Sequence, residues 1–266
     1  MAPFATRGVS RFRSLDFRYN APLIVPANRP SKSRNRKAPQ RLLLNRALPM
    51  EASFTIPTRW LNSIVALFLL PVVWVLTAAF FSAFAHIARR PEFWRTEEFL
   101  FFALGTFAWL LVFCASLYAF GEPRPLRVYV FGHELTHAIW AKAMGGKVFA
   151  FEHSREGGFV VTDKHNFLIA LAPYFHPLYA IMVIAAYGAA SVFYDLSAYT
   201  PALFALLGIT WSFHFSFTIW MILKGQSDLA VNGTFFSLVL IYLLNLILLA
   251  AVLVFVAPEV TFLAFW

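Results

Sequence analysis

Six apolar segments run along the chain, and they restrict its fold more than any other feature. They cover about residues 61–86, 99–120, 126–144, 167–190, 201–223 and 234–257. A helix needs about 20 apolar residues to cross a bilayer. Charged residues make up only 13% of the chain, about half the fraction found in soluble domains. We therefore expect an all-α polytopic membrane protein with about six transmembrane helices.

A polar stretch of about twenty residues separates the third apolar segment from the fourth. Residues 147–151 and 159–162 are rich in β-branched and aromatic side chains, and Gly157 and Gly158 between them favour a turn. This pattern predicts a β-hairpin directly after the third helix. An ordinary loop between helices is the alternative.

The first 49 residues differ from the rest in charge and in proline content. They hold eleven Lys and Arg against one acidic residue, together with six prolines. Such a composition is typical of disorder, so we expect a disordered basic tail over residues 1–49 and a membrane domain over residues 50–266. The tail is an organelle transit peptide, a segment that binds anionic lipid, or sequence upstream of a natural start at Met50. We favour the last of these.

The position of the basic residues also bears on partners and location. Without the tail, the two sides of the membrane receive 3 and 8 Lys and Arg; with it they receive 14 and 8, and the orientation reverses. Because a basic stretch alone is a nonspecific signal for nucleic acid, we expect the lipid bilayer and no nucleic acid as a partner. The expected location is the bacterial inner (cell) membrane, or an organelle membrane if the tail is a transit peptide.

The third segment contains the run His133-Glu134-Leu135-Thr136-His137. Histidines four residues apart lie on one face of a helix, so both rings can bind a single zinc ion. Glu134 is placed to activate a zinc-bound water by taking its proton and to pass that proton to a leaving amine. Ionisable groups inside a membrane helix are functional candidates by default. We predict one Zn²⁺ per chain on His133 and His137, with Glu134 as the catalytic base.

A catalytic zinc site needs a third protein ligand and one open position. We predict Asp228, which follows the fifth apolar segment, at a point where a helix end can bend back toward the metal. His214, in the middle of the fifth segment, is the alternative ligand, and His176 is a weaker one; both are more often hydrogen-bonded between helices. The remaining downstream candidates, assigned to turns, loops or the C-terminus, are Glu152, His153, Glu156, Asp163, His165, Asp195 and Glu259.

Residues 131–138, Phe-Gly-His-Glu-Leu-Thr-His-Ala, resemble the motif helix of the site-2 protease family of intramembrane zinc proteases. The glycine pair 145–146 with the strand-like residues up to 161 is similar to that family's hairpin, and residues 168–173 to the start of its next helix. Asp228 stands where the family places its aspartate ligand, although Leu229 replaces the usual glycine and no proline lies nearby. The resemblance covers about residues 126–230 and implies a divergent member.

The resemblance implies hydrolysis of a peptide bond in a membrane-embedded protein substrate, with a metalloprotease core at about residues 126–230. We expect residues 147–162 to hold an unwound substrate segment by strand addition at an exposed hairpin edge. Two other functions are alternatives. One is a non-catalytic zinc-binding membrane scaffold related to such proteases. The other is a metal or proton transporter, which the absence of internal sequence repeats disfavours.

Overall fold

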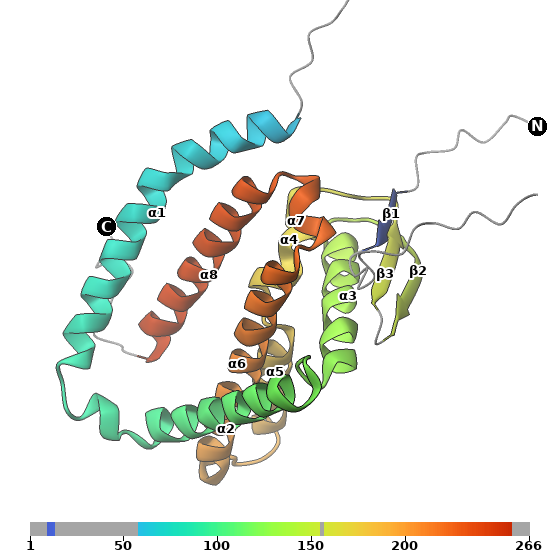
Figure 1. The fold of residues 1–266 in the computed structure, drawn as a ribbon. Coiled ribbons are helices and arrows are strands. Elements are labelled where there is room, and N and C mark those ends of the chain that lie inside the picture. Colours follow the sequence, from blue (N-terminus) through green and yellow to red (C-terminus); the bar gives the residue numbers. More distant parts are fainter. Residues whose placement is uncertain (1–9, 14–57, 155–156, 257–266) are drawn as a thin grey trace, which may run out of the picture.

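The computed structural model describes residues 10–13, 58–154 and 157–256 of the 266-residue chain, and most of these are helical (Figure 1). The helices are α1 (Thr58–Ala88), α2 (Glu97–Phe120), α3 (Leu126–Ala143), α4 (Phe167–Phe175), α5 (Leu178–Ser191), α6 (Thr200–Lys224), α7 (Ser227–Val231) and α8 (Thr234–Val256), with single 3-10 turns at Phe93–Arg95 and Ser197–Tyr199. The strands are β1 (Ser10–Arg13), β2 (Val148–His153) and β3 (Gly158–Thr162).

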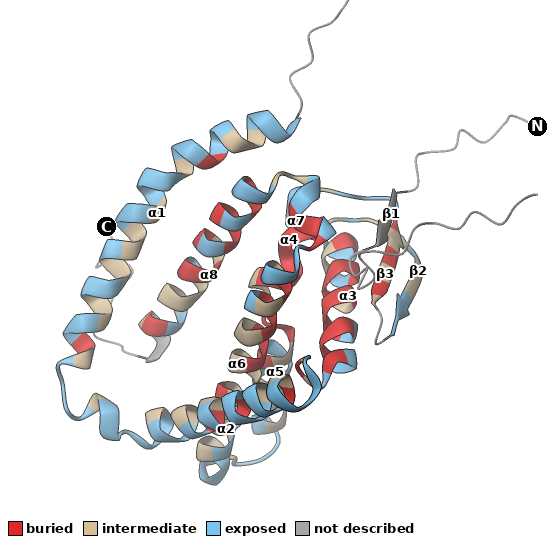
Figure 2. Ribbon diagram, viewed as in Figure 1, coloured by how far each residue is buried: buried red, intermediate tan, exposed pale blue. Residues whose placement is uncertain are grey.

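Four helices in the described part of the chain, α1, α2, α6 and α8, are long and apolar enough to cross a membrane. Their outward faces carry large apolar side chains: Phe68 is 78% exposed, Trp74 76% and Leu223 80%. Figure 2 shows this exposed surface along α1 and α2, while buried residues concentrate on α3, α4 and α7. Such a surface is favourable against lipid and not against water. The expectation of a multi-pass, mostly helical membrane protein is confirmed.

The fourth apolar segment is not the continuous helix that its sequence suggests. It breaks after Phe175, and α4 and α5 meet at an angle of 71°. Pro177 has no N–H to continue the helix, and it forces the preceding residue, His176, out of the helical region, to φ −104° and ψ 98°. Counted as one bent span, the pair brings the apolar spans of the described residues to five. Helix α3, which carries the polar motif, is not among them.

Helices α2 and α6 pack closely because two glycines lie at their crossing. A Cβ atom on Gly105 would overlap the carbonyl oxygen of Ala205, and one on Gly208 would overlap that of Phe102. Small residues let membrane helices approach in this way. A group of aromatic rings then joins this pair to α3, with the rings of Tyr129 and Phe217 stacked at 4.5 Å. This packing fixes the position of α3 along the axis of α6.

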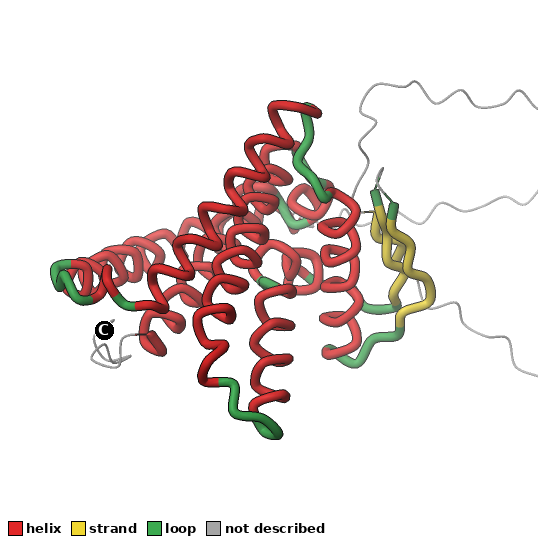
Figure 3. The backbone as a smooth tube through the Cα atoms, turned by 90° about the horizontal axis from the view of Figure 1, so that it is seen from below, coloured by secondary structure: helices red, strands yellow, loops and turns green. Residues whose placement is uncertain are grey.

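The predicted hairpin after α3 is confirmed: β2 and β3 pair antiparallel, with Phe151 opposite Val160 and His153 opposite Gly158. The sheet lies outside α3, on the side away from the other helices, as Figure 3 shows from a second direction. A third strand, β1, pairs antiparallel with β3, so the strand order is β1-β3-β2. β1 comes from the segment for which we expected disorder. The rest of residues 1–49, and the start of the membrane domain at residue 50, lie outside the described residues.

Candidate metal centre

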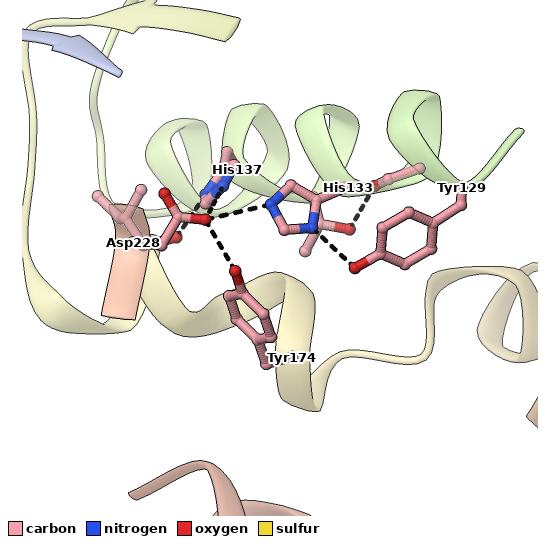
Figure 4. A network of polar contacts seen from close by, with 8 residues as sticks. Tyr129, His133, His137, Tyr174 and Asp228 are labelled. Carbon is pink, nitrogen blue, oxygen red and sulfur yellow. Dashed lines mark hydrogen bonds and ion pairs between the residues drawn. The ribbon is translucent and has the colours of Figure 1, made fainter. Parts of the chain in front are cut away.

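Helix α3 presents His133 and His137 one turn apart, as the four-residue spacing predicts, and both point toward α4 and α7 (Figure 4). The third member of the site arrives from the end of α6. Gly225 ends that helix in the left-handed conformation at φ 75°, which glycine adopts without strain. The chain then turns back into the short helix α7, and this places Asp228 against the two histidines. All three side chains are buried.

The distances within this group match a metal site. Nε2 of His133 lies 3.2 Å from Oδ2 of Asp228, and Nε2 of His137 lies 3.7 Å from the same oxygen. Ligands of a tetrahedral zinc ion, each about 2.0–2.2 Å from the metal, are about 3.3–3.6 Å apart. Oδ1 of Asp228 is buried without a hydrogen-bond partner among the described residues. Two imidazoles and a carboxylate therefore fit a divalent cation, with no other protein ligand required.

Neighbouring groups orient each of the three candidate ligands. Nδ1 of His137 lies 2.8 Å from the carbonyl oxygen of Ile169. Because a carbonyl only accepts, Nδ1 carries the proton and Nε2 is left for a metal. Nδ1 of His133 contacts the Tyr129 hydroxyl at 3.2 Å, and the Tyr174 hydroxyl donates to Oδ2 of Asp228 at 3.1 Å. Contacts of this kind are typical of the residues that support metal ligands.

Asp228 lies in α7, between the spans, and its environment keeps it ionised. Burial alone raises the pKa of its carboxyl group, but hydrogen bonds and charge interactions with His133 and His137 outweigh this effect and lower the pKa to about 2. An ionised carboxylate is the form that binds a metal ion. The third candidate ligand is therefore ionised at neutral pH.

Glu134 is fully buried, and it faces the sheet. A Cβ atom on Gly158, at the start of β3, would lie 2.5 Å from Cγ of Glu134. Only glycine allows the strand backbone to approach the glutamate so closely. The sequence pattern of Gly157 and Gly158 indicates a turn, but it does not reveal the contact of Gly158 with Glu134.

Comparisons of the chain with protein-family models, with curated proteins and with solved structures give no match. Among the described residues, one group of three His, Cys, Asp or Glu side chains has ligand atoms that all lie within 4.8 Å of one another. It consists of His133, His137 and Asp228.

The other candidate ligands lie outside this group. His214 on α6 and His176 at the break between α4 and α5 line a cavity beside His133. Among the described residues, Glu152, His153, Asp163, His165 and Asp195 are not part of the group either, and Glu156 and Glu259 lie outside the described residues.

Two functional residues, Tyr129 and Tyr174, were not predicted. Tyr129 stands four residues before His133 on the same helix face, and this spacing is a signal that could have found it. Tyr174 has no local signal, because only the packing of α4 against α7 brings it to Asp228.

Proposed function

We propose that this chain is an intramembrane zinc metalloprotease, a divergent member of the site-2 protease family, that hydrolyses a peptide bond in a membrane-embedded substrate. The observation that supports it is the buried group His133, His137 and Asp228, with Glu134 on the same helix. Two histidines and a carboxylate that leave one position open are the ligands of a catalytic zinc ion. In this proposal α3 and the bent pair α4–α5 complete six spans, in the bacterial inner membrane or in an organelle membrane.

Each side chain of the site has a defined task in this reaction. Zinc, when bound, polarises a carbonyl group and lowers the pKa of water to about 7. His133, His137 and Asp228 hold the ion, while Tyr129 and Tyr174 fix the orientation of His133 and Asp228. Glu134 takes a proton from the attacking water and delivers it to the nitrogen of the leaving amine as the C–N bond breaks. Burial of the site strengthens these charge interactions.

The experiment that tests this function measures zinc content and cleavage in the detergent-purified chain, with single-span membrane proteins as substrates. We expect about one zinc ion per chain, and cleavage that a chelator removes and added zinc restores. A folded chain without zinc would contradict the proposal, and a folded chain that binds zinc but cleaves no substrate would favour the zinc-binding scaffold.

The sheet is where we expect the unwound substrate to bind. Gly158 brings β3 into contact with Glu134, so a peptide paired with β3 lies close to the catalytic base. The structure changes one part of the expectation: the second edge of β3 is covered by β1, with Arg13 opposite Phe159 and Ser10 opposite Thr162. A substrate strand that pairs with β3 must therefore displace residues 10–13.

Deletion of residues 1–49 is expected to lower the KM for such a substrate by about tenfold. An attached strand competes with the substrate at an effective concentration of about millimolar, and the deletion removes that competitor. The measurement is the rate of cleavage against substrate concentration. A deletion of residues 1–9 alone, which leaves β1 in place, is the matched control and should keep the original KM. Equal KM values for both deletions would contradict strand addition at this edge.

A further inference from the structure

A cavity beside His133 takes no part in the chemistry described so far. Its volume is about 20 Å³, and one water molecule needs about 10–15 Å³ of space open to a sphere of its own radius. Its polar lining residues are Tyr129, His133, Thr136, His176, Tyr179 and His214. The cavity is thus large enough for a single water and has polar groups to bind it, the two conditions for an ordered internal water.

His214 brings an acceptor to this cavity. The side chain is buried, and the carbonyl oxygen of Tyr174 acts on its ring as a hydrogen-bond acceptor. Nε2 has no hydrogen-bond partner among the described residues, so we assign the proton to Nδ1, on the side of that carbonyl. In a neutral imidazole Nε2 is then a bare acceptor. A buried acceptor is unfavourable unless a donor reaches it.

Tyr129 brings a donor to the same cavity. When Nε2 of His133 binds a metal, Nδ1 carries the proton and donates it to the Tyr129 hydroxyl, 3.2 Å away. The hydrogen of that hydroxyl group is then left to donate to a further acceptor. The two sides of the cavity are therefore complementary to a molecule that accepts one hydrogen bond and donates another.

We propose that the cavity is a binding site for one water molecule, which accepts a hydrogen bond from Tyr129 and donates one to His214. The water closes a network that supports two metal ligands. On one side it reaches His133 through Tyr129. On the other it reaches the backbone carbonyl of Tyr174 through His214, and the side-chain hydroxyl of the same tyrosine donates to Asp228. His214 is then a positioning residue for the metal site and not a metal ligand.

This inference rests on the metal-binding part of the proposed function and not on proteolysis, so its test measures metal affinity. Full-length His214→Phe, Tyr129→Phe and the double variant are titrated with Co²⁺ and Zn²⁺ against a chelator of known affinity, and the Co²⁺ absorption spectrum is recorded. Loss of a group that supports a metal ligand weakens binding by about 10–100-fold. We expect about tenfold weaker binding in each single variant, and no further loss in the double variant, because both bind the same water.

Two further variants make the result specific. His214→Gln keeps an acceptor oxygen but loses the aromatic ring. It should recover part of the metal affinity if the hydrogen bond to the water, and not the packing of the ring, supports the site. Thr218→Val, one turn further along α6, removes a buried hydroxyl with no partner among the described residues and outside the cavity lining, and should bind metal like the wild type. A wild-type spectrum in His214→Phe further shows that His214 is not itself a ligand.

The outcomes separate this inference from the proposed function. Wild-type affinity in His214→Phe, or losses that add in the double variant, would overturn the water site alone. A change of the Co²⁺ spectrum to that of a site with one ligand fewer in His214→Phe would also overturn it, by making His214 a ligand. A wild-type chain that binds neither metal would overturn the proposed function, and this inference with it.

Discussion

Replacement of Glu134 by glutamine is expected to abolish cleavage while the zinc stays bound. Glutamine keeps the size of the side chain and its contact with Gly158, but it cannot take a proton from water. A positioned general acid and base contributes about 10²–10⁴-fold to a reaction rate, so turnover should fall by at least about a hundredfold. The measurement is turnover of a membrane-embedded substrate beside the zinc content of the same preparation.

The matched control for this experiment is Glu98→Gln. Glu98 lies in the first turn of α2 and is exposed, so the same chemical change there should leave turnover near the wild-type value. Full turnover in Glu134→Gln would remove the hydrolytic role of Glu134 and favour a scaffold or a transporter that uses the same metal site.

Replacement of Asp228 by alanine is expected to remove the metal itself. The carboxylate is the only negative ligand in the group, and without it His133 and His137 offer two ligands where a catalytic zinc site has three. We expect zinc to fall well below one ion per chain after dialysis against a chelator, with cleavage lost in parallel. Zinc content by mass spectrometry and cleavage of the same substrate check both expectations.

Asp195→Ala is the control for the effect of losing an aspartate. Asp195 lies in the loop after α5, where its carboxylate accepts a hydrogen bond from the backbone N–H of Ser197, far in sequence from the metal ligands. It should keep one zinc ion per chain. A full complement of zinc in Asp228→Ala would contradict Asp228 as the third ligand and would point to His214.

The parts of the site that could be predicted from the sequence depend on local geometry. His133 and His137 share a face because the helical repeat places residues four apart above one another. Asp228 could be predicted as a ligand because it follows the end of an apolar helix. The break after Phe175 also has a local signal, since a residue before proline is forced out of the helical region, and Pro177 lies inside the apolar segment at residues 167–190.

The parts that could not be predicted depend on pairings between distant segments. Strand β1 lies about 150 residues before the strand that it pairs with, and nothing in residues 10–13 specifies that partner. The contact of Gly158 with Glu134 and the hydrogen bond from Tyr174 to Asp228 likewise exist only once helices and sheet have packed. Tertiary packing, and not local preference, decides such contacts.

The short helix α7 also sets the time at which the site can form during synthesis. His133 and His137 are made with α3, but their partner Asp228 is 95 residues further along the chain from His133. Helices α4, α5 and α6 must be made, and α7 must dock beside Tyr174, before the three ligands can meet. A nascent chain therefore carries its two histidines without a complete site until most of the membrane domain has been inserted. In the proposed function, metal loading would therefore be a late step of assembly, and the growing chain would be unable to cleave its neighbours before its own fold is nearly complete.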